Sequence, residues 1–330
     1  MSANPTMNSE PPAAAAAPDA TAPASGHLPY LGVIRFAGAD AAGFLQGQLS
    51  NDTRRLAAGA PLVAAYSTPQ GRVLAVLHLL PHSSGILALL PREIVLPTLE
   101  RLRKFVLRAK VQIQDVSDQL HVFGFHGPDA LRAASLEPPA AAPGYVEHGG
   151  LGICRVRAEE ERYWAVGSNA CLAQYGLIRD GGSAAGGSAA GATASLEHDW
   201  RLADIRAGAP QIYAATREMF VAQMLNLDRI DGISFTKGCF TGQEIIARTQ
   251  HLGRIKRRLF RLGLPAGTWA LGQAVHLRDG RTGRLTEFVS VAGGVEALAV
   301  LTLDADPAAA ESTLVDAAEL PLPYSLVSEG

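Results

Sequence analysis

The chain has 330 residues, of which 48% are hydrophobic and 18% charged, so most of it is expected to fold around a substantial core in two or three domains. Its formal net charge of −2 does not suggest a dedicated nucleic-acid-binding protein, which usually carries a clear basic excess. The three cysteines, Cys154, Cys171 and Cys239, have no CxxC spacing, which disfavours a zinc ribbon and a disulfide scaffold.

Targeting signals are not evident in the sequence. No apolar run approaches the roughly 20 residues of a membrane span, and the N-terminus lacks a basic segment followed by an apolar one. Together with unpaired cysteines, this predicts a cytoplasmic protein with no membrane partner. Residues 1–28 are rich in Ala, Pro, Ser and Thr and are expected to form a disordered tail.

Strand and helix patterns alternate from Leu31 to Asp115. The order strand, helix, two strands, a further strand, helix, strand resembles a split-βαβ, ferredoxin-like unit. The expected elements are strands at 31–36, 62–67, 72–80, 86–90 and 111–115, and helices at 40–49 (capped by Asp40) and 97–108. His78 and His82 flank Pro81 and are expected to be surface and turn residues. No metal site is predicted.

A partial second copy follows, with strands at 121–125, 151–156 and 163–166 and helices at 128–134 and 170–178. The stretch 181–194, GGSAAGGSAAGATA, has the composition of a flexible loop. A helix is expected at 196–207. The tail from about residue 257 is rich in short strands, with an Asp279-Gly280 hairpin signal, which favours a small β-barrel.

One segment, from Asp231 to Arg258, combines a cysteine, a lysine and glycines before a helix. Thr241 and Glu244 fit a capping box, which would place Cys239 just before the helix N-terminus and two residues after Lys237. The helix dipole and the cation would both favour a thiolate, so the pKa of Cys239 is expected to be lowered. The alternative is a buried structural cysteine in a turn. Cys154 and Cys171 are expected to serve ordinary core packing.

The residues of this segment resemble a known family. They look like the signature K-G-C-[FY]-x-G-Q-E-x-x-x-R of the YgfZ folate-binding proteins, which are relatives of the glycine-cleavage aminomethyltransferase. The matching residues are Lys237, Gly238, Cys239, Phe240, Gly242, Gln243, Glu244 and Arg248. Other segments agree with the resemblance, which spans about residues 30–326. They are Phe44–Asp52, the Pro69–Arg72 turn, Arg206–Pro210 and Leu322–Leu326.

The resemblance implies an α+β, GcvT/YgfZ-like ring of three domains around a channel that binds tetrahydrofolate. Two ferredoxin-like units and a C-terminal small β-barrel would supply the domains. The implied division is a tail at 1–28, a discontinuous folate-binding domain at 29–115 plus 196–255, a second domain at 116–180, a loop at 181–195 and the barrel at 256–330.

By resemblance, Trp200, Gln48, Asp52 and Arg206 are candidate folate contacts. Relatives often have Glu at the position of Arg206, and an arginine cannot accept the hydrogen bonds that a carboxylate accepts. Where the aminomethyltransferases carry acidic residues after the glycine turn, this chain has Ala75 and Val76, which cannot act as a base.

The resemblance implies a tetrahydrofolate-binding accessory protein for iron–sulfur cluster assembly or repair, with Cys239 as its reactive thiol. It would support tRNA modification indirectly, and its partners would be folate and iron–sulfur enzymes or assembly factors. A basic group near the motif can attract the polyglutamate tail of folate, or it can simply be the solvent-exposed beginning of a strand. Its members are Arg248, Arg254, Lys256, Arg257 and Arg258. The alternatives are a folate-dependent one-carbon transferase and a non-catalytic folate-binding scaffold. Whether the chain is an enzyme stays open.

Overall fold

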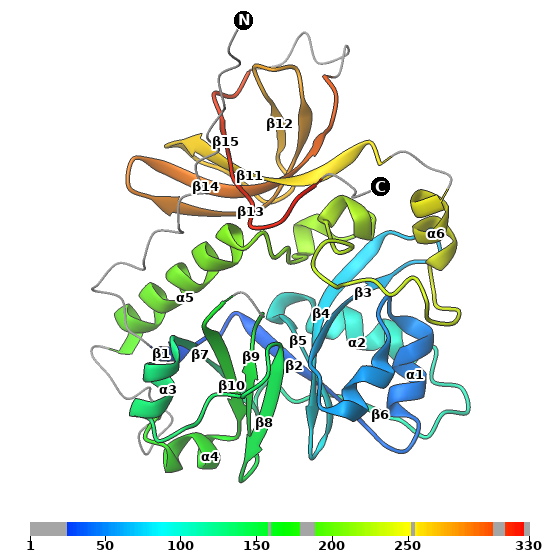
Figure 1. Cartoon of the computed structure of the whole chain (residues 1–330), viewed down its shortest axis with the longest axis vertical. Helices are drawn as coiled ribbons and strands as arrows, with labels where there is room; N and C mark the ends of the chain where they lie inside the picture. The colour runs from blue at the N-terminus through cyan, green and yellow to red at the C-terminus, as the bar shows by residue number, and fades with distance from the viewer. Residues whose placement is uncertain (1–24, 158–159, 179–188, 252–254, 306–313, 327–330) are drawn as a thin grey trace, which may run out of the picture.

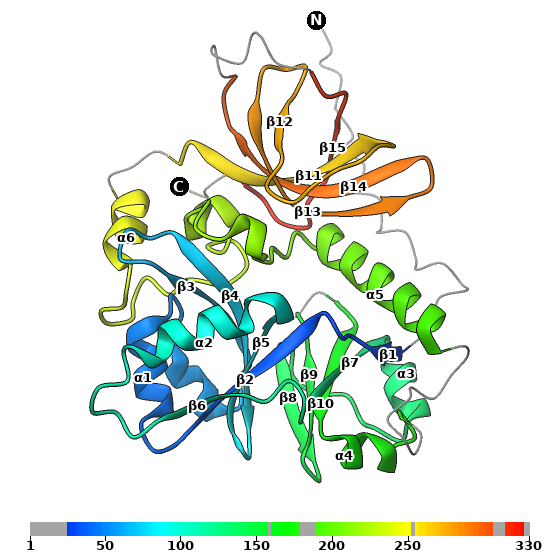
Figure 2. The same cartoon turned by 180° about the vertical axis from the view of Figure 1, so that it is seen from behind.

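The computed structural model describes residues 25–157, 160–178, 189–251, 255–305 and 314–326. These residues form three five-stranded antiparallel sheets. Figures 1 and 2 show the three sheets at the corners of a triangle, with the segment 207–236 between them. In this part of the chain, no helix is long and apolar enough to cross a membrane.

The first sheet has the order β3-β4-β5-β2-β6, so β5 lies between β2 and β4. This is the split arrangement that the strand and helix order predicts. Helix α1 buries Ala41, Phe44 and Leu45, at helical spacing, in the core of this unit. The elements are β2 (Leu31–Ala37), α1 (Ala41–Gln48), η1 (Thr53–Ala58), β3 (Leu62–Ser67), β4 (Val73–His82), β5 (Gly85–Pro91), η2 (Arg92–Ile94), α2 (Val95–Arg103) and β6 (Gln112–Asp115).

The second sheet repeats the first, with the order β1-β7-β10-β9-β8. Strand β1 occupies the edge position that β6 takes in the first sheet, although β1 precedes both units in the sequence. Residues 25–28 were expected in the disordered tail, but they form this strand and the buried Leu28. The elements are β1 (Ser25–His27), β7 (His121–His126), α3 (Pro128–Ala133), β8 (Gly144–His148), β9 (Leu151–Arg155), β10 (Arg162–Gly167) and α4 (Asn169–Gln174).

The third sheet has the order β12-β13-β14-β11-β15. A parallel bridge between Leu277 and Val315 brings its two edges together at one point. The described strands form a sheet whose edges meet at this bridge, and the small barrel expected from the sequence stays a prediction. The strands are β11 (Arg257–Pro265), β12 (Ala274–His276), β13 (Thr282–Val291), β14 (Gly294–Thr302) and β15 (Ala318–Leu320).

The segment between the second and third sheets joins all three units. Helix α5 (Ala189–Arg206) contacts β1, β13 and β14. After it come η3 (Ala214–Thr216), η4 (Ala222–Leu225) and α6 (Gln243–His251), and apolar residues from 205 to 246 join the core of the first unit. Helix α5 includes residues 189–195, which were expected in the flexible loop. The rest of that loop, 181–188, and the tail 1–24 lie outside the described residues.

Candidate functional site

The structure brings the family-like segments of the sequence together around the loop 231–242. Ser50 Oγ donates a hydrogen bond to the Gly232 carbonyl at 2.6 Å, and Asn51 Nδ2 donates to the Asp231 carbonyl at 2.5 Å. Both donors are completely buried. The segment after α1 therefore holds the start of the loop that carries Cys239.

Lys237 fastens the middle of this loop to the end of α1. Its Nζ donates to the carbonyl oxygens of Gln46, Leu49 and Asn51, at 2.7, 2.6 and 2.9 Å. An ammonium group has three protons, so these contacts use all of them. Burial lowers the pKa of Lys237 to about 8, and the group stays mostly protonated at neutral pH. Lys237 therefore positions the loop, and its expected effect on the Cys239 thiolate stays a prediction.

The helix after Cys239 begins at Gln243, later than the capping box requires. Gly242 precedes it with a φ of +84°, and a Cβ there would lie 2.7 Å from the Thr68 carbonyl oxygen. Gln243 Oε1 accepts from the Phe240 amide at 3.0 Å. Gln243, rather than Thr241, therefore supplies the side chain that orders this turn. Gly242 allows the turn to pack closely against the segment that follows β3.

Cys239 is exposed, as are Gly238, Glu244 and Arg248. The structure thus contradicts the alternative of a buried structural cysteine at this position. Cys154 is buried in β9, and burial raises the pKa of its thiol far above the ordinary range. Cys171, on α4, is partly exposed.

The residues expected to contact folate are mostly engaged within the protein. Trp200 has no exposed surface; the Arg162 guanidinium lies 4.8 Å from its ring centroid. A buried indole cannot stack on a ligand from solvent, so Trp200 is a core residue. Arg206 forms an ion pair with Glu296 at 2.8 Å and links α5 to β14.

The remaining two candidates lie near α1. Asp52 pairs with Arg54 at 2.5 Å, and hydrogen bonds from Arg54 hold its pKa well below the usual range. Gln48 keeps a buried side-chain oxygen with no partner among the described residues. Neither residue lines the cavity described below.

The basic run at the start of β11 is not one uniform patch. Arg258 is buried and forms an ion pair with Asp228 at 2.6 Å, so it is not available to an anionic ligand in solvent. Lys256 and Arg257 are exposed. Arg254 lies outside the described residues.

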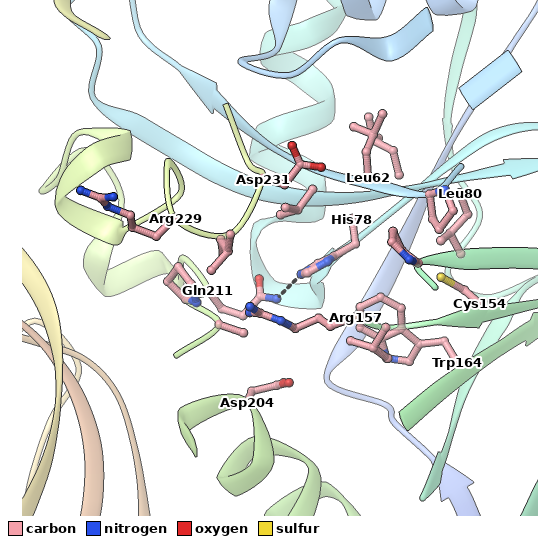
Figure 3. A pocket seen from close by; sticks show the side chains of 18 residues that line it. Leu62, His78, Leu80, Cys154, Arg157, Trp164, Asp204, Gln211, Arg229 and Asp231 are labelled. Carbon is pink, nitrogen blue, oxygen red and sulfur yellow. Dashed lines mark hydrogen bonds between the residues drawn. The ribbon is translucent and has the colours of Figure 1, made fainter. Parts of the chain in front are cut away.

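A cavity of about 210 Å³ lies between the first and second units (Figure 3). Strands β3, β4, β9 and β10 and the segments around Asp204, Gln211 and Asp231 form its walls. The lining residues are Pro61, Leu62, Val63, His78, Leu79, Leu80, Pro143, Cys154, Val156, Arg157, Trp164, Asp204, Ala209, Pro210, Gln211, Arg229, Ile230 and Asp231.

A buried carboxylate lies on one wall of the cavity. Asp204 Oδ1 accepts a hydrogen bond from Arg162 at 2.8 Å, and Arg162 also contacts Glu160 at 2.5 Å. Burial raises the pKa of Asp204 to about 7, against the opposing effect of Arg162. Asp204 is therefore held in place by an arginine and titrates near neutral pH, which is typical of residues in functional sites.

His78 and Gln211 form a second polar pair in the cavity. Gln211 Nε2 lies 2.8 Å from His78 Nε2, and Gln211 Oε1 is buried without a partner among the described residues (Figure 3). Trp164 packs edge-on against the His78 ring, with 4.9 Å between centroids, and its own Nε1 has no partner in the described part of the chain. The sequence predicted His78 at the surface, but the structure places it in the cavity wall.

Two sequence comparisons bear on the identity of the protein. A tRNA-modifying protein YgfZ from Colwellia psychrerythraea is 33% identical over 237 residues, which cover 71% of this chain and 69% of the relative. The protein of the same name from Escherichia coli is 30% identical over 300 residues, covering 88% of this chain and 89% of the relative. The chain belongs to the YgfZ family.

No family model matches this YgfZ-family chain. Among solved structures it is similar to the glycine cleavage system aminomethyltransferase T from Bartonella henselae, with a TM-score of 0.57 and 15% identity. The similarity covers 86% of this chain and 80% of the other. At this level of identity, it shows that the two proteins share a fold.

Sequence reasoning about this YgfZ-family chain missed the cavity residues. The resemblance pointed to the loop around Cys239, and the structure assembles that loop from the expected segments. His78, Asp204 and Gln211 had no motif to mark them, because they come from a strand, a helix end and a connecting segment that meet only in the folded chain. The one available signal was Asp204, an acidic residue within a helix whose neighbours are apolar.

Proposed function

We propose that this YgfZ-family protein is a tetrahydrofolate-binding accessory factor that supports iron–sulfur cluster assembly or repair. Tetrahydrofolate would bind in the cavity between the first two units, and Cys239 would act as the reactive thiol at the surface. The observation that carries the folate proposal is a cavity between two units, whose lining combines apolar side chains with a buried carboxylate, a histidine and a glutamine.

The donors and acceptors of the cavity fit a pterin. A pterin ring presents an amino group and a ring N–H beside a carbonyl oxygen, so it needs both acceptors and donors. Gln211, Asp204 and Trp164 line the cavity and carry acceptor and donor groups of these kinds. Arg157 and Arg229 also line the cavity and can attract the carboxylates of the glutamate tail.

The position of Cys239 supports a role for a thiol at the surface. Its side chain is exposed, while the flanking Lys237 is fixed by three hydrogen bonds. A fixed loop that presents a thiol to solvent can meet a partner protein without a costly rearrangement. The relatives are named tRNA-modifying proteins. In our proposal this chain serves tRNA modification indirectly, through iron–sulfur enzymes, because its net charge of −2 provides no general attraction for RNA.

Aminomethyl transfer is not part of the proposal. Ala75 and Val76, at the positions where the transferases carry acidic residues, are completely buried apolar side chains of β4. They cannot take or hold a proton.

Calorimetry with tetrahydrofolate under anaerobic conditions tests the folate part. We expect saturable binding to the wild type and at least roughly tenfold weaker binding to Asp204→Asn, which replaces one acceptor oxygen by an amide donor. Asp118→Asn is the matched control, because Asp118 is 91% exposed and pairs only with Arg92 among the described residues. The absence of heat with the wild type would remove folate from the proposal.

A cellular assay tests the thiol part. Cells that lack their own copy of this protein would express the wild type, Cys239→Ser or Cys171→Ser, and the activity of an iron–sulfur enzyme would be measured under oxidant stress. We expect Cys239→Ser to behave like the empty vector and Cys171→Ser like the wild type. Full activity with Cys239→Ser would exclude the reactive thiol.

A further inference from the structure

Two arginines of the structure lie near one buried tyrosine of the first unit. Tyr66, near the end of β3, is 1% exposed, and its hydroxyl has no hydrogen-bond partner within the described chain. Burial raises the pKa of this hydroxyl, and the positive charges of Arg101 and Arg217 oppose the rise, so both guanidinium groups act on the same place. Arg101 belongs to the last turn of α2, and Arg217 directly follows η3.

Hydrogen bonds on both sides of Arg217 hold its segment against the first unit. The Glu93 carboxylate, just before α2, accepts from the Ala214 amide at 2.6 Å. The Glu218 amide donates to the carbonyl of Val73 at 2.9 Å, at the start of β4, and β4 pairs with β3. The segment therefore connects the beginning of α2 to the beginning of β4, and the position of Arg217 beside Tyr66 is fixed by the backbone.

Neither arginine uses its guanidinium group within the described chain. Both side chains are partly buried, and the Nε of each is buried without a hydrogen-bond partner. The Nη nitrogens also form no hydrogen bond or ion pair with described residues, but they are not buried, so an anion in solvent can reach them. Glu100 and Glu218, their acidic neighbours in the sequence, are exposed and pair with neither arginine.

This arrangement leaves two partly desolvated positive charges without a counter-ion. Partial burial costs each guanidinium some of its hydration, and no carboxylate of the described chain replaces it. An anionic ligand that accepts from both groups would supply what the protein does not. The Tyr66 hydroxyl stays uncharged, because its pKa is raised, and adds no repulsion for such a ligand.

The charge and shape of the site favour a phosphate group. A guanidinium donates two parallel hydrogen bonds to a phosphate or a carboxylate. A phosphomonoester carries a charge of about −1.5 to −2 at neutral pH and has three terminal oxygens, so two arginines can bind it together. A single carboxylate or a phosphodiester has one negative charge and two terminal oxygens, which suffice for only one guanidinium.

We propose that Arg101 and Arg217 form a binding site for the phosphate group of a small phosphomonoester, beside the Tyr66 hydroxyl. The site is separate from the cavity, because none of these three residues lines it. Tyr66 lies toward the opposite end of β3 from Leu62, which does line the cavity. The inference goes beyond the proposed folate function and does not depend on it.

Calorimetry with inorganic phosphate at constant ionic strength tests the site. We expect saturable binding to the wild type and at least roughly tenfold weaker binding to Arg101→Gln and to Arg217→Gln, because each variant loses charged donors. Arg108→Gln is the matched control: Arg108 is exposed and unpaired in the described chain, and the affinity should stay within about twofold. No saturable binding to the wild type, or equal binding to both site variants, would overturn the proposal.

Three further anions test the class of ligand. Glycerol phosphate, a monoester, should bind about as tightly as inorganic phosphate. Dimethyl phosphate, a diester with a single charge, and glutarate, with two separate carboxylates, should each bind roughly tenfold more weakly. Dimethyl phosphate binding as tightly as the monoester would point to a nucleic-acid backbone, and tighter binding of glutarate would point to a carboxylate ligand. Either result would overturn the assignment to a phosphomonoester.

Chemical modification of the wild type gives a readout that does not depend on the folding of variants. Phenylglyoxal reacts with accessible guanidinium groups, and mass spectrometry measures the reaction at each arginine. We expect a saturating concentration of inorganic phosphate to slow the modification of Arg101 and Arg217 several-fold and to leave Arg108 unchanged. Equal protection of all three arginines, or protection of none, would overturn the proposal and leave the folate function standing.

Discussion

Replacing Lys237 by methionine should destabilise the protein and release the loop that carries Cys239. Methionine keeps most of the length of the side chain but donates no hydrogen bonds. The carbonyls of Gln46, Leu49 and Asn51 would then lose a donor that lies 2.6–2.9 Å away. The first two belong to the last turn and C-cap of α1, where helix carbonyls have no partner within the helix.

The expected loss in the free energy of unfolding follows from these contacts. A hydrogen bond from a charged donor contributes about 1.5–3 kcal/mol net. The three bonds share one ammonium group, whose ordering costs up to about 2 kcal/mol of side-chain entropy. Water can also reach a half-buried site and replace part of what is lost. We therefore expect Lys237→Met to lower the unfolding free energy by about 2–3 kcal/mol.

Urea denaturation followed by circular dichroism measures this difference. Lys104→Met is the matched control, because Lys104 is exposed at the end of α2 and should change the stability by less than about 0.5 kcal/mol. The rate at which Cys239 reacts with iodoacetamide gives a second readout, and freeing the loop should change it. Equal stability of Lys237→Met and Lys104→Met would refute the positioning role of Lys237.

Three further predictions follow from packing, titration and exposure. Gly124→Ala should lower the unfolding free energy, measured by thermal unfolding, by about 1–3 kcal/mol, because the new Cβ would lie 2.5 Å from a buried indole. Gly43→Ala is the control: it has open space around it and should stabilise α1 by up to about 1 kcal/mol. Equal effects of the two substitutions would contradict the packing at Gly124. Burial lowers the pKa of His126 from 6.5 to about 4, so between these pH values the unfolded chain binds more protons than the folded one. The unfolding free energy should therefore fall as the pH drops from 6.5 to 4, and urea titrations at several pH values should show a smaller fall for His126→Gln. An unchanged pH profile in this variant would contradict the burial of His126. Mass spectrometry after brief alkylation should find Cys239 modified and Cys154 protected, and the opposite order would disprove the exposures of the two thiols.

Much of the fold could be predicted from local patterns. Apolar residues at helical spacing predicted α1, and alternating strands and helices predicted the first split unit and part of the second, without β8. Strand β1 could not be found in this way, because three residues, Ser25–His27, form a strand only when β7 supplies the hydrogen-bonding partner. Its sequence, SGH, has no strand propensity of its own.

The functional loop was partly visible in the sequence. The motif around Cys239 and its resemblance to a family were local features, and they were enough to single out this thiol. The partners of Lys237 lie 186 to 191 residues away in the chain, so its role as a positioning residue depended on the folded contacts. The capping box failed because Gly242 has a positive φ and ends the turn one residue later.

The sequence by itself determined the alternating strands and helices, the family resemblance and the reactive-thiol hypothesis, because each depends on neighbouring residues or on a contiguous motif. Only the tertiary structure decided the cavity. His78 and Gln211 are 133 residues apart, and Arg162 and Asp204 are 42 residues apart. The burial of a side chain and its hydrogen-bond partners depend on how the units pack against each other. That packing places Trp200 in the core and His78 in the wall of the cavity.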